Sequence, residues 1–143
     1  MIYTKLTKKA LLTAYEAHRG QYDRTGLPYI FHPYHLAEQM DDEYSVCTAL
    51  LHDVVEDTDI SIEGLRKAGF PEEVLKAVEL LTHKDGVDYF DYVRAIRSDP
   101  LAVKVKLADL EHNSDATRLG NITDRDRERL EKYEKAKQIL LDN

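Results

Sequence analysis

The chain has 143 residues, the length of one ordinary domain, and can bury roughly 68% of the surface that its unfolded form would expose. Hydrophobic residues make up 43% and charged residues 33%, a composition typical of soluble globular proteins and not of disordered ones. The net charge of −7 argues against nucleic acid or a membrane surface as partner. The apolar runs are far shorter than the roughly 20 residues that cross a bilayer, and the N-terminus lacks the apolar core of a signal peptide. We therefore expect a single cytoplasmic domain covering residues 1–143.

Helical periodicity runs through most of the chain, because apolar residues recur at spacings of three and four. A loop with two glycines and a proline interrupts this pattern at residues 20–28. The only cysteine, Cys47, lies within an apolar helical pattern and is expected in the core. The predicted helices cover residues 6–18, 33–40, 44–55, 61–69, 71–83, 88–96, 101–110 and 123–141. We predict an all-α fold, a bundle of about six to eight helices.

The segment at residues 101–110 is ambiguous. Leu101, Val103, Val105 and Leu107 alternate with other residues as in a β-strand. The preceding Asp99-Pro100 pair, however, supplies a helix cap and a proline suited to a first helical turn. We predict a buried helix.

The last predicted helix, at residues 123–141, is strongly charged. Leu130, Tyr133, Ala136 and Leu140 form an apolar stripe, and the charged residues between them include stabilising Glu–Lys pairs four residues apart. We predict that the charged side is a solvated face and not a binding patch.

The stretch LLHDVVEDT at residues 50–58 carries the most chemistry. An apolar run ends in His52-Asp53, which offers a metal one nitrogen and one oxygen ligand. Glu56 and Asp57 follow three and four residues after Asp53, so they share its face if the helix continues. Such an arrangement would place proton-handling groups beside metal ligands, as metal-assisted hydrolysis requires.

Four residues are candidates for one metal site: His32, His52, Asp53 and Asp109. Asp53 and Asp109 each follow an apolar run, where an unpaired carboxylate would be costly and a cation would remove that cost. His32 precedes Pro33, which restricts its backbone. Mixed nitrogen and oxygen ligands suit manganese, iron, zinc or magnesium. Taken one at a time, the histidines are better explained as structural residues, and the two carboxylates as helix-end groups paired with lysines. Their joint occurrence favours a metal site.

The segments PYIFHP, LLHDVVEDT and VKLADLEHN together resemble the HD-domain metal phosphohydrolases. More narrowly, they resemble the (p)ppGpp hydrolase domain of the RelA/SpoT family and its small stand-alone hydrolases, over residues 17–113. The resemblance implies that His32, His52, Asp53 and Asp109 bind one divalent metal, usually Mn²⁺. It also implies that Glu56 and Asp57 support the attacking water, and that the reaction removes pyrophosphate from the 3′ position of a guanine nucleotide.

The resemblance further implies a substrate contact at Asn113, although a buried structural asparagine explains this residue nearly as well. Of the family's basic pair before the Gly-x-Pro-Tyr segment, only Arg24 is present, preceded by Asp23 and followed by Thr25. We expect Arg24 and Thr25 to contact substrate.

Two departures concern the substrate. Asp23 and Asp115 stand where the family pattern has basic residues, so two cations have become anions near a highly charged nucleotide. Arg118 is a candidate to compensate. The predicted function is metal-dependent hydrolysis of a nucleotide phosphate ester or pyrophosphate, with (p)ppGpp as the leading substrate. The alternatives are an HD enzyme with a less charged nucleotide substrate and a non-catalytic nucleotide-binding module. The sequence leaves the oligomeric state open.

Overall fold

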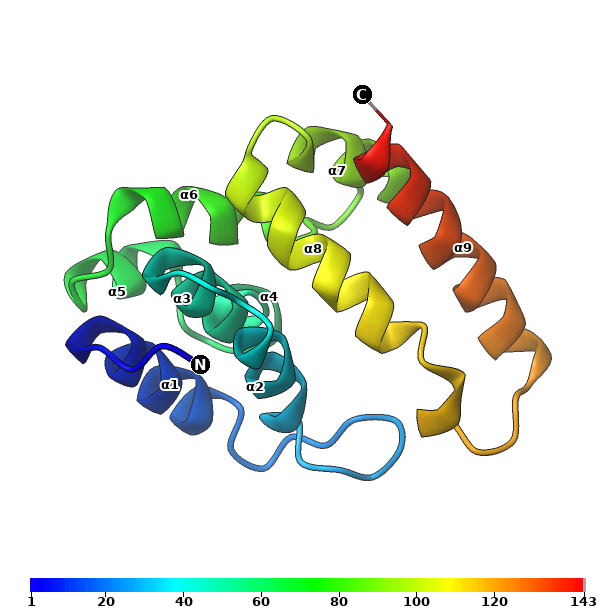
Figure 1. Cartoon of the computed structure of the whole chain (residues 1–143), viewed down its shortest axis with the longest axis horizontal. Coiled ribbons are helices and arrows are strands. Elements are labelled where there is room, and N and C mark those ends of the chain that lie inside the picture. Colours follow the sequence, from blue (N-terminus) through cyan, green and yellow to red (C-terminus); the bar gives the residue numbers. More distant parts are fainter. Residues whose placement is uncertain (143) are drawn as a thin grey trace.

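The computed structural model describes residues 1–142, and these residues form an all-α fold without any strand (Figure 1). The all-α prediction is therefore confirmed. An isolated β-bridge between Tyr22 and Pro28 closes the loop that follows the first helix. The α-helices are α1 (Lys5–Ala17), α2 (Phe31–Glu38), α3 (Glu43–Leu51), α4 (Val54–Asp57), α5 (Ile62–Lys67), α6 (Glu72–Leu81), α7 (Tyr89–Ile96), α8 (Pro100–Asn113) and α9 (Asp124–Leu141), and a 3₁₀ turn, η1, covers Ala116–Arg118.

Helix α3 forms the centre of the bundle. Every residue of α3 from Ser45 to Leu51 is buried, as expected of a helix that is apolar on all sides. It packs against α1, α2, α6 and α8, while α9 packs along α8 and α7 (Figure 1). Asp42 begins α3 by accepting a hydrogen bond from the backbone N–H of Ser45. Cys47 is buried in this core.

The segment with strand-like alternation is helix α8. Asp99 caps it through the backbone N–H of Leu101, and Pro100 occupies its first turn. Because the segment is helical, Lys106, Asp109 and Asn113 lie at spacings of three and four residues and share one face. The prediction of a helix here is confirmed.

The predicted continuous helix at residues 44–55 is wrong. Helix α3 ends at Leu51, His52 and Asp53 form a turn, and α4 is a separate turn of four residues. The Nδ1–H of His52 donates to the carbonyl oxygen of Ala49 at 2.7 Å. The break therefore places the His-Asp pair between two helices, and Glu56 and Asp57 belong to the second of them.

None of the helices within residues 1–142 is long and apolar enough to cross a membrane.

Candidate metal centre and adjoining cleft

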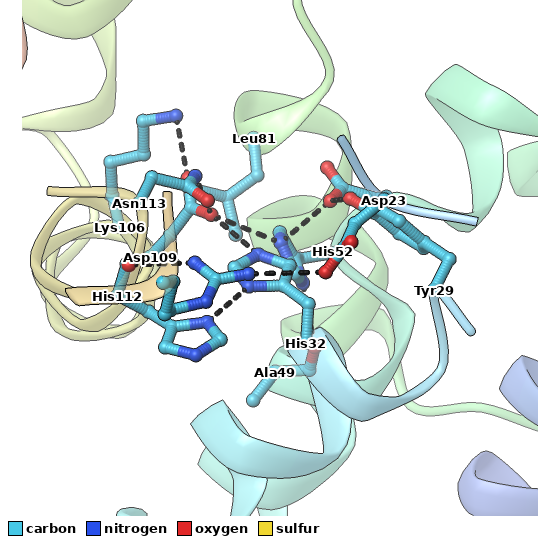
Figure 2. A network of polar contacts seen from close by, with 12 residues as sticks. Asp23, Tyr29, His32, Ala49, His52, Leu81, Lys106, Asp109, His112 and Asn113 are labelled. Carbon is cyan, nitrogen blue, oxygen red and sulfur yellow. Dashed lines mark hydrogen bonds and ion pairs between the residues drawn. The ribbon is translucent and has the colours of Figure 1, made fainter. Parts of the chain in front are cut away.

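The four candidate ligands come together although they are far apart in the sequence. Ligand atoms of His32 from α2, His52 and Asp53 from the α3–α4 turn, and Asp109 from α8 all lie within 4.8 Å of one another. Figure 2 shows His32, His52 and Asp109 pointing toward one another. We call this group the metal centre. His32, His52 and Asp109 are buried. The sequence prediction that these side chains meet agrees with this geometry, and their role as metal ligands stays a prediction.

The environment of His52 shows that the centre fits a cation. Because its Nδ1–H donates a hydrogen bond to the Ala49 carbonyl oxygen, Nε2 of the neutral ring carries a lone pair and no proton. Nε2 lies 2.9 Å from Asp53 Oδ2 and 3.5 Å from Asp109 Oδ1, yet it makes no hydrogen bond of acceptable geometry and is fully buried. A lone pair facing two carboxylates is unfavourable unless a proton or a metal cation lies between them. The two nitrogens and two carboxylates therefore fit a divalent transition metal.

The same conflict appears in the pKa values of the residues at the centre. Burial alone lowers the pKa of His52, but the Asp53 and Asp109 carboxylates outweigh it and raise that pKa well above its usual value. Burial alone raises the pKa of Asp53, but the adjacent His52 lowers it to about 2. The two carboxylates thus favour positive charge at His52 despite its burial, at the place where a cation would bind.

Two residues outside the predicted set hold the carboxylates of the centre. Tyr29 Oη donates a hydrogen bond to Asp53 Oδ2. The buried ammonium of Lys106 lies 2.9 Å from Asp109 Oδ2, on the opposite side of that carboxylate from His32. Sequence reasoning missed Lys106, since a lysine in an alternating apolar segment gives no sign of burial.

Asn113 is oriented by the centre. Its Nδ2 donates to Asp109 Oδ1 at 3.0 Å, so the structural role weighed from the sequence is present. Asn113 also lines the two cavities described next, and a contact with substrate there stays a prediction.

Two cavities meet beside the centre and share Tyr29, Asn113 and Tyr133, so we call them together the cleft. The acidic cavity, of about 250 Å³, contains Asp53 and Asp109. The basic cavity, of about 270 Å³, is lined at its rim by Arg24, Arg118 and Arg129. The cleft therefore runs from carboxylates at the metal centre to guanidinium groups at the far end.

Glu56 and Asp57 line the acidic cavity, and their carboxylates offer oxygen atoms within 4.8 Å of Asp53. Glu56 Oε1 accepts the backbone N–H of His83 at 2.6 Å, which fixes its carboxylate. Partial loss of hydration, followed by the neighbouring charges of Asp53 and Glu56, raises the pKa of Asp57 to about 6. Loss of hydration also raises the pKa of Glu56. A carboxylate with a raised pKa next to a metal centre suits proton transfer near neutral pH.

Helix α9 contributes side chains to the cleft, so part of its charged face lines a cavity; that this face has no binding role stays a prediction. Arg129 and Tyr133 line the basic cavity, and Lys132 lines the acidic one, with its Nζ 4.1 Å from the centre of the Tyr89 ring. The sequence places these residues on one side of a charged helix but gives no sign of what that side faces.

The two acidic departures do not add free negative charge to the cleft. Asp23 lines the basic cavity, but its Oδ1 accepts hydrogen bonds from Thr25 and from the Leu27 N–H, and its Oδ2 lies 3.3 Å from Arg118. Asp115 caps η1 by accepting from Thr117 and lines neither cavity of the cleft.

Arg24 and Thr25, the two loop residues predicted to contact substrate, each have a partner within the protein. Arg24 and Thr25 both line the basic cavity. The Arg24 guanidinium pairs with the buried Asp126 of α9, which joins the loop to that helix, and the Thr25 hydroxyl donates to Asp23. Contact of either residue with substrate stays a prediction.

An all-α fold with histidines and a His-Asp turn around one centre is the arrangement that defines HD-domain proteins. The HD domain family profile matches residues 10–141, and the chain belongs to this family.

Individual relatives allow a finer comparison than the family profile does. A probable guanosine-3′,5′-bis(diphosphate) 3′-pyrophosphohydrolase of Synechocystis sp. is 36% identical over 120 residues, which are 73% of this chain and 16% of the relative. The bifunctional (p)ppGpp synthase/hydrolase SpoT of Escherichia coli strain K12 is 33% identical over 124 residues, 76% of this chain and 18% of the relative. The chain thus spans less than a fifth of the curated relatives it matches.

A solved structure of similar size also matches. It is described as a metazoan ortholog of SpoT that hydrolyzes ppGpp and plays a role in starvation responses. The TM-score is 0.76 at 26% sequence identity, and the match covers 99% of this chain and 86% of that one. The likeness therefore extends over nearly the whole fold.

Proposed function

We propose that this chain, acting as a single HD domain, is a metal-dependent phosphohydrolase that removes pyrophosphate from the 3′ position of guanosine 3′,5′-bis(diphosphate). The observation that carries the proposal is the convergence of His32, His52, Asp53 and Asp109 on one point, with Nε2 of His52 facing two carboxylates. The activities printed for the relatives and for the solved structure support the choice of substrate.

The four residues would hold one divalent cation, which we propose is Mn²⁺. Such a cation would polarise a phosphoryl oxygen and make a nearby water more acidic. Glu56 and Asp57 would accept the proton of the attacking water as it adds to the 3′ phosphorus. The bond from phosphorus to ribose O3′ then breaks, pyrophosphate leaves, and O3′ gains a proton.

The charge distribution of the cleft supports a polyphosphate substrate. The acidic cavity needs a cation before a phosphate can enter, whereas the basic cavity presents three arginines. Each arginine has an acidic neighbour, Asp23 for Arg118 and Asp126 for Arg24 and Arg129. The contact of Arg129 is the longest, at 3.7 Å, and its buried Nη1 has no hydrogen-bond partner among residues 1–142. Of the three arginines, Arg129 is therefore the one best able to bind a phosphate of the substrate. A nucleotide substrate would also place the enzyme in the cytoplasm.

The test is turnover of ppGpp by purified protein with Mn²⁺, with EDTA, and with Mn²⁺ restored. We expect pyrophosphate release with Mn²⁺, loss of activity with EDTA and recovery on Mn²⁺ addition. Turnover at the full rate without metal would contradict the mechanism. A panel of nucleotides, scored for pyrophosphate and orthophosphate, distinguishes ppGpp from a less charged substrate, and binding without any product indicates a non-catalytic module.

Glu56→Gln tests the proton acceptor. We expect turnover to fall about a hundredfold, the usual scale for loss of acid–base help, with Mn²⁺ binding retained. The matched control is Glu79→Gln on the exposed side of α6, away from the cleft. A Glu56→Gln rate equal to that of the control would remove Glu56 from the chemistry.

A further inference from the structure

His112 lies next to the metal centre without belonging to it. His112 Nδ1 is 2.7 Å from Nδ1 of His32, and the two ring planes are only 9° apart with their centroids separated by 5.0 Å. At this nitrogen separation the rings lie edge to edge in nearly one plane, not face to face. This is the geometry of a direct hydrogen bond between two imidazole rings.

The hydrogen bond constrains which nitrogen of His32 is free. His32 Nε2 faces Asp109 Oδ1 at 2.8 Å and is the nitrogen that the metal centre would use. A metal ligand nitrogen must carry a lone pair, so the proton of the neutral ring must then be on Nδ1. The atom next to that proton is His112 Nδ1, which would accept it.

His112 is itself held in place from three sides. Its backbone carbonyl accepts from Arg118 Nη1 at 2.8 Å, and its ring packs on His35 with centroids 4.2 Å apart. Helix α8 carries it three residues after Asp109. Its second nitrogen points away from the centre (Figure 2), and the residue lines a separate cavity of about 310 Å³ with His35 and Asp115. The ring can therefore exchange its other proton without disturbing the contact with His32.

We propose that His112 is a positioning residue: by accepting a hydrogen bond from His32 Nδ1–H, it fixes the ring orientation and the tautomer in which His32 Nε2 can bind the metal. This inference rests on the proposed metal-dependent function and assigns it a residue outside the four ligands. When no cation is present, the same contact persists with His112 as donor and His32 Nε2–H bonded to Asp109. A histidine suits the position because it can both donate and accept.

The test measures metal affinity and the tautomer, not only activity. His112→Phe keeps a planar ring but removes the acceptor, and His112→Asn restores an acceptor near the position of Nδ1. By titration calorimetry with Mn²⁺ alone we expect H112F to bind about 10- to 100-fold more weakly, the usual effect of losing a hydrogen-bond partner of a metal ligand. We expect H112N to recover most of the loss, and turnover of H112F to be restored by excess Mn²⁺.

The matched control is His35→Phe, because His35 packs on the same ring but makes no hydrogen bond to His32. We expect H35F to bind Mn²⁺ as the wild type does. In addition, ¹⁵N NMR of wild-type protein with Zn²⁺ should show the His32 proton on Nδ1, a readout that does not depend on the folding of any variant. A His32 ring without that proton, or H112F with wild-type affinity, would overturn this inference alone. Absence of Mn²⁺ binding in the wild-type chain would overturn the proposed function as well.

Discussion

Lys106 provides a quantitative test of how the centre balances its charges. Its side chain is buried and lines the acidic cavity, with the ammonium nitrogen 2.9 Å from Asp109 Oδ2 and 5.2 Å from the centre of the Tyr92 ring. Asp109 has no other cationic side chain beside it except the histidines of the centre, among the residues that the structure describes. Lys106→Met keeps the aliphatic part of the side chain and removes the charge.

The expected loss in metal-free protein is large. Removing one partner of a buried ion pair costs about 3–5 kcal/mol, because the other charge is left uncompensated. For 143 residues, an unfolding entropy of about 2.1 cal/mol/K per residue converts this cost into a melting temperature lower by about 10–17 °C. A cation at the centre would supply Asp109 with the missing positive charge. At about 100 times its Kd, Mn²⁺ stabilises the folded state by about 2.7 kcal/mol, and the variant should bind it more tightly because Lys106 no longer competes.

The assay is thermal unfolding of wild-type and K106M protein in EDTA and in saturating Mn²⁺. The control is Lys104→Met, two residues earlier on α8, whose pairs with Asp41 and Asp42 are exposed and worth about 0–1 kcal/mol. We expect the K106M deficit to be large in EDTA and much smaller with Mn²⁺. If K106M melts like K104M, or has the same deficit in both conditions, the charge balance described here is wrong.

Three further outcomes follow from the charges of the centre and the cleft. The folded-state pKa of His52 is raised, so the stability that its proton contributes is present below about pH 6.5 and is lost as pH rises through the raised value. The melting temperature in EDTA should therefore fall above neutrality, and the increase in melting temperature that Mn²⁺ produces should become larger. The pKa of Asp57 is about 6, and a bound cation would lower it further. Because only the charged carboxylate can accept a proton, kcat/KM should fall tenfold per pH unit below an inflection at or under about pH 6. An inflection above pH 7 would exclude Asp57 as the proton acceptor. Asp23→Ala removes the hydrogen bonds that order residues 23–27, so KM should rise with kcat little changed, whereas a free repulsive anion at this position predicts a lower KM.

Much of the centre could be predicted from local sequence. His32 before a proline, the His52-Asp53 pair after an apolar run, and Asp109 within a capped helix each have a local signal. Their meeting around one point follows from helix packing, which the sequence does not show. The break after Leu51 was also hidden, because no glycine or proline marks it and His52 bonds back to the turn that it ends.

One physical reason explains why sequence reasoning missed several residues of the centre and the cleft. Lys106, Arg129 and Lys132 are cations on helices that also carry ordinary solvated charges, and local sequence cannot separate the two kinds. Only tertiary packing decides that Lys106 faces Asp109 and that α9 turns Arg129 and Lys132 toward the cleft. The same holds for Asp23, whose charge is neutralised by Arg118 from a segment 95 residues later.

The division of charge within the cleft separates reaction chemistry from substrate choice. If the centre binds a cation and a phosphoryl group as proposed, its four residues would serve any phosphate ester. Selection must then come from the basic cavity, where Arg129 of α9 and Arg24 of the loop both lie near Asp126. One carboxylate between two guanidinium groups leaves a net positive charge that a substrate phosphate can use. Replacing Asp126 would release both arginines and loosen the joint between loop and helix, so changes of substrate preference among related chains should appear here and leave the metal centre intact.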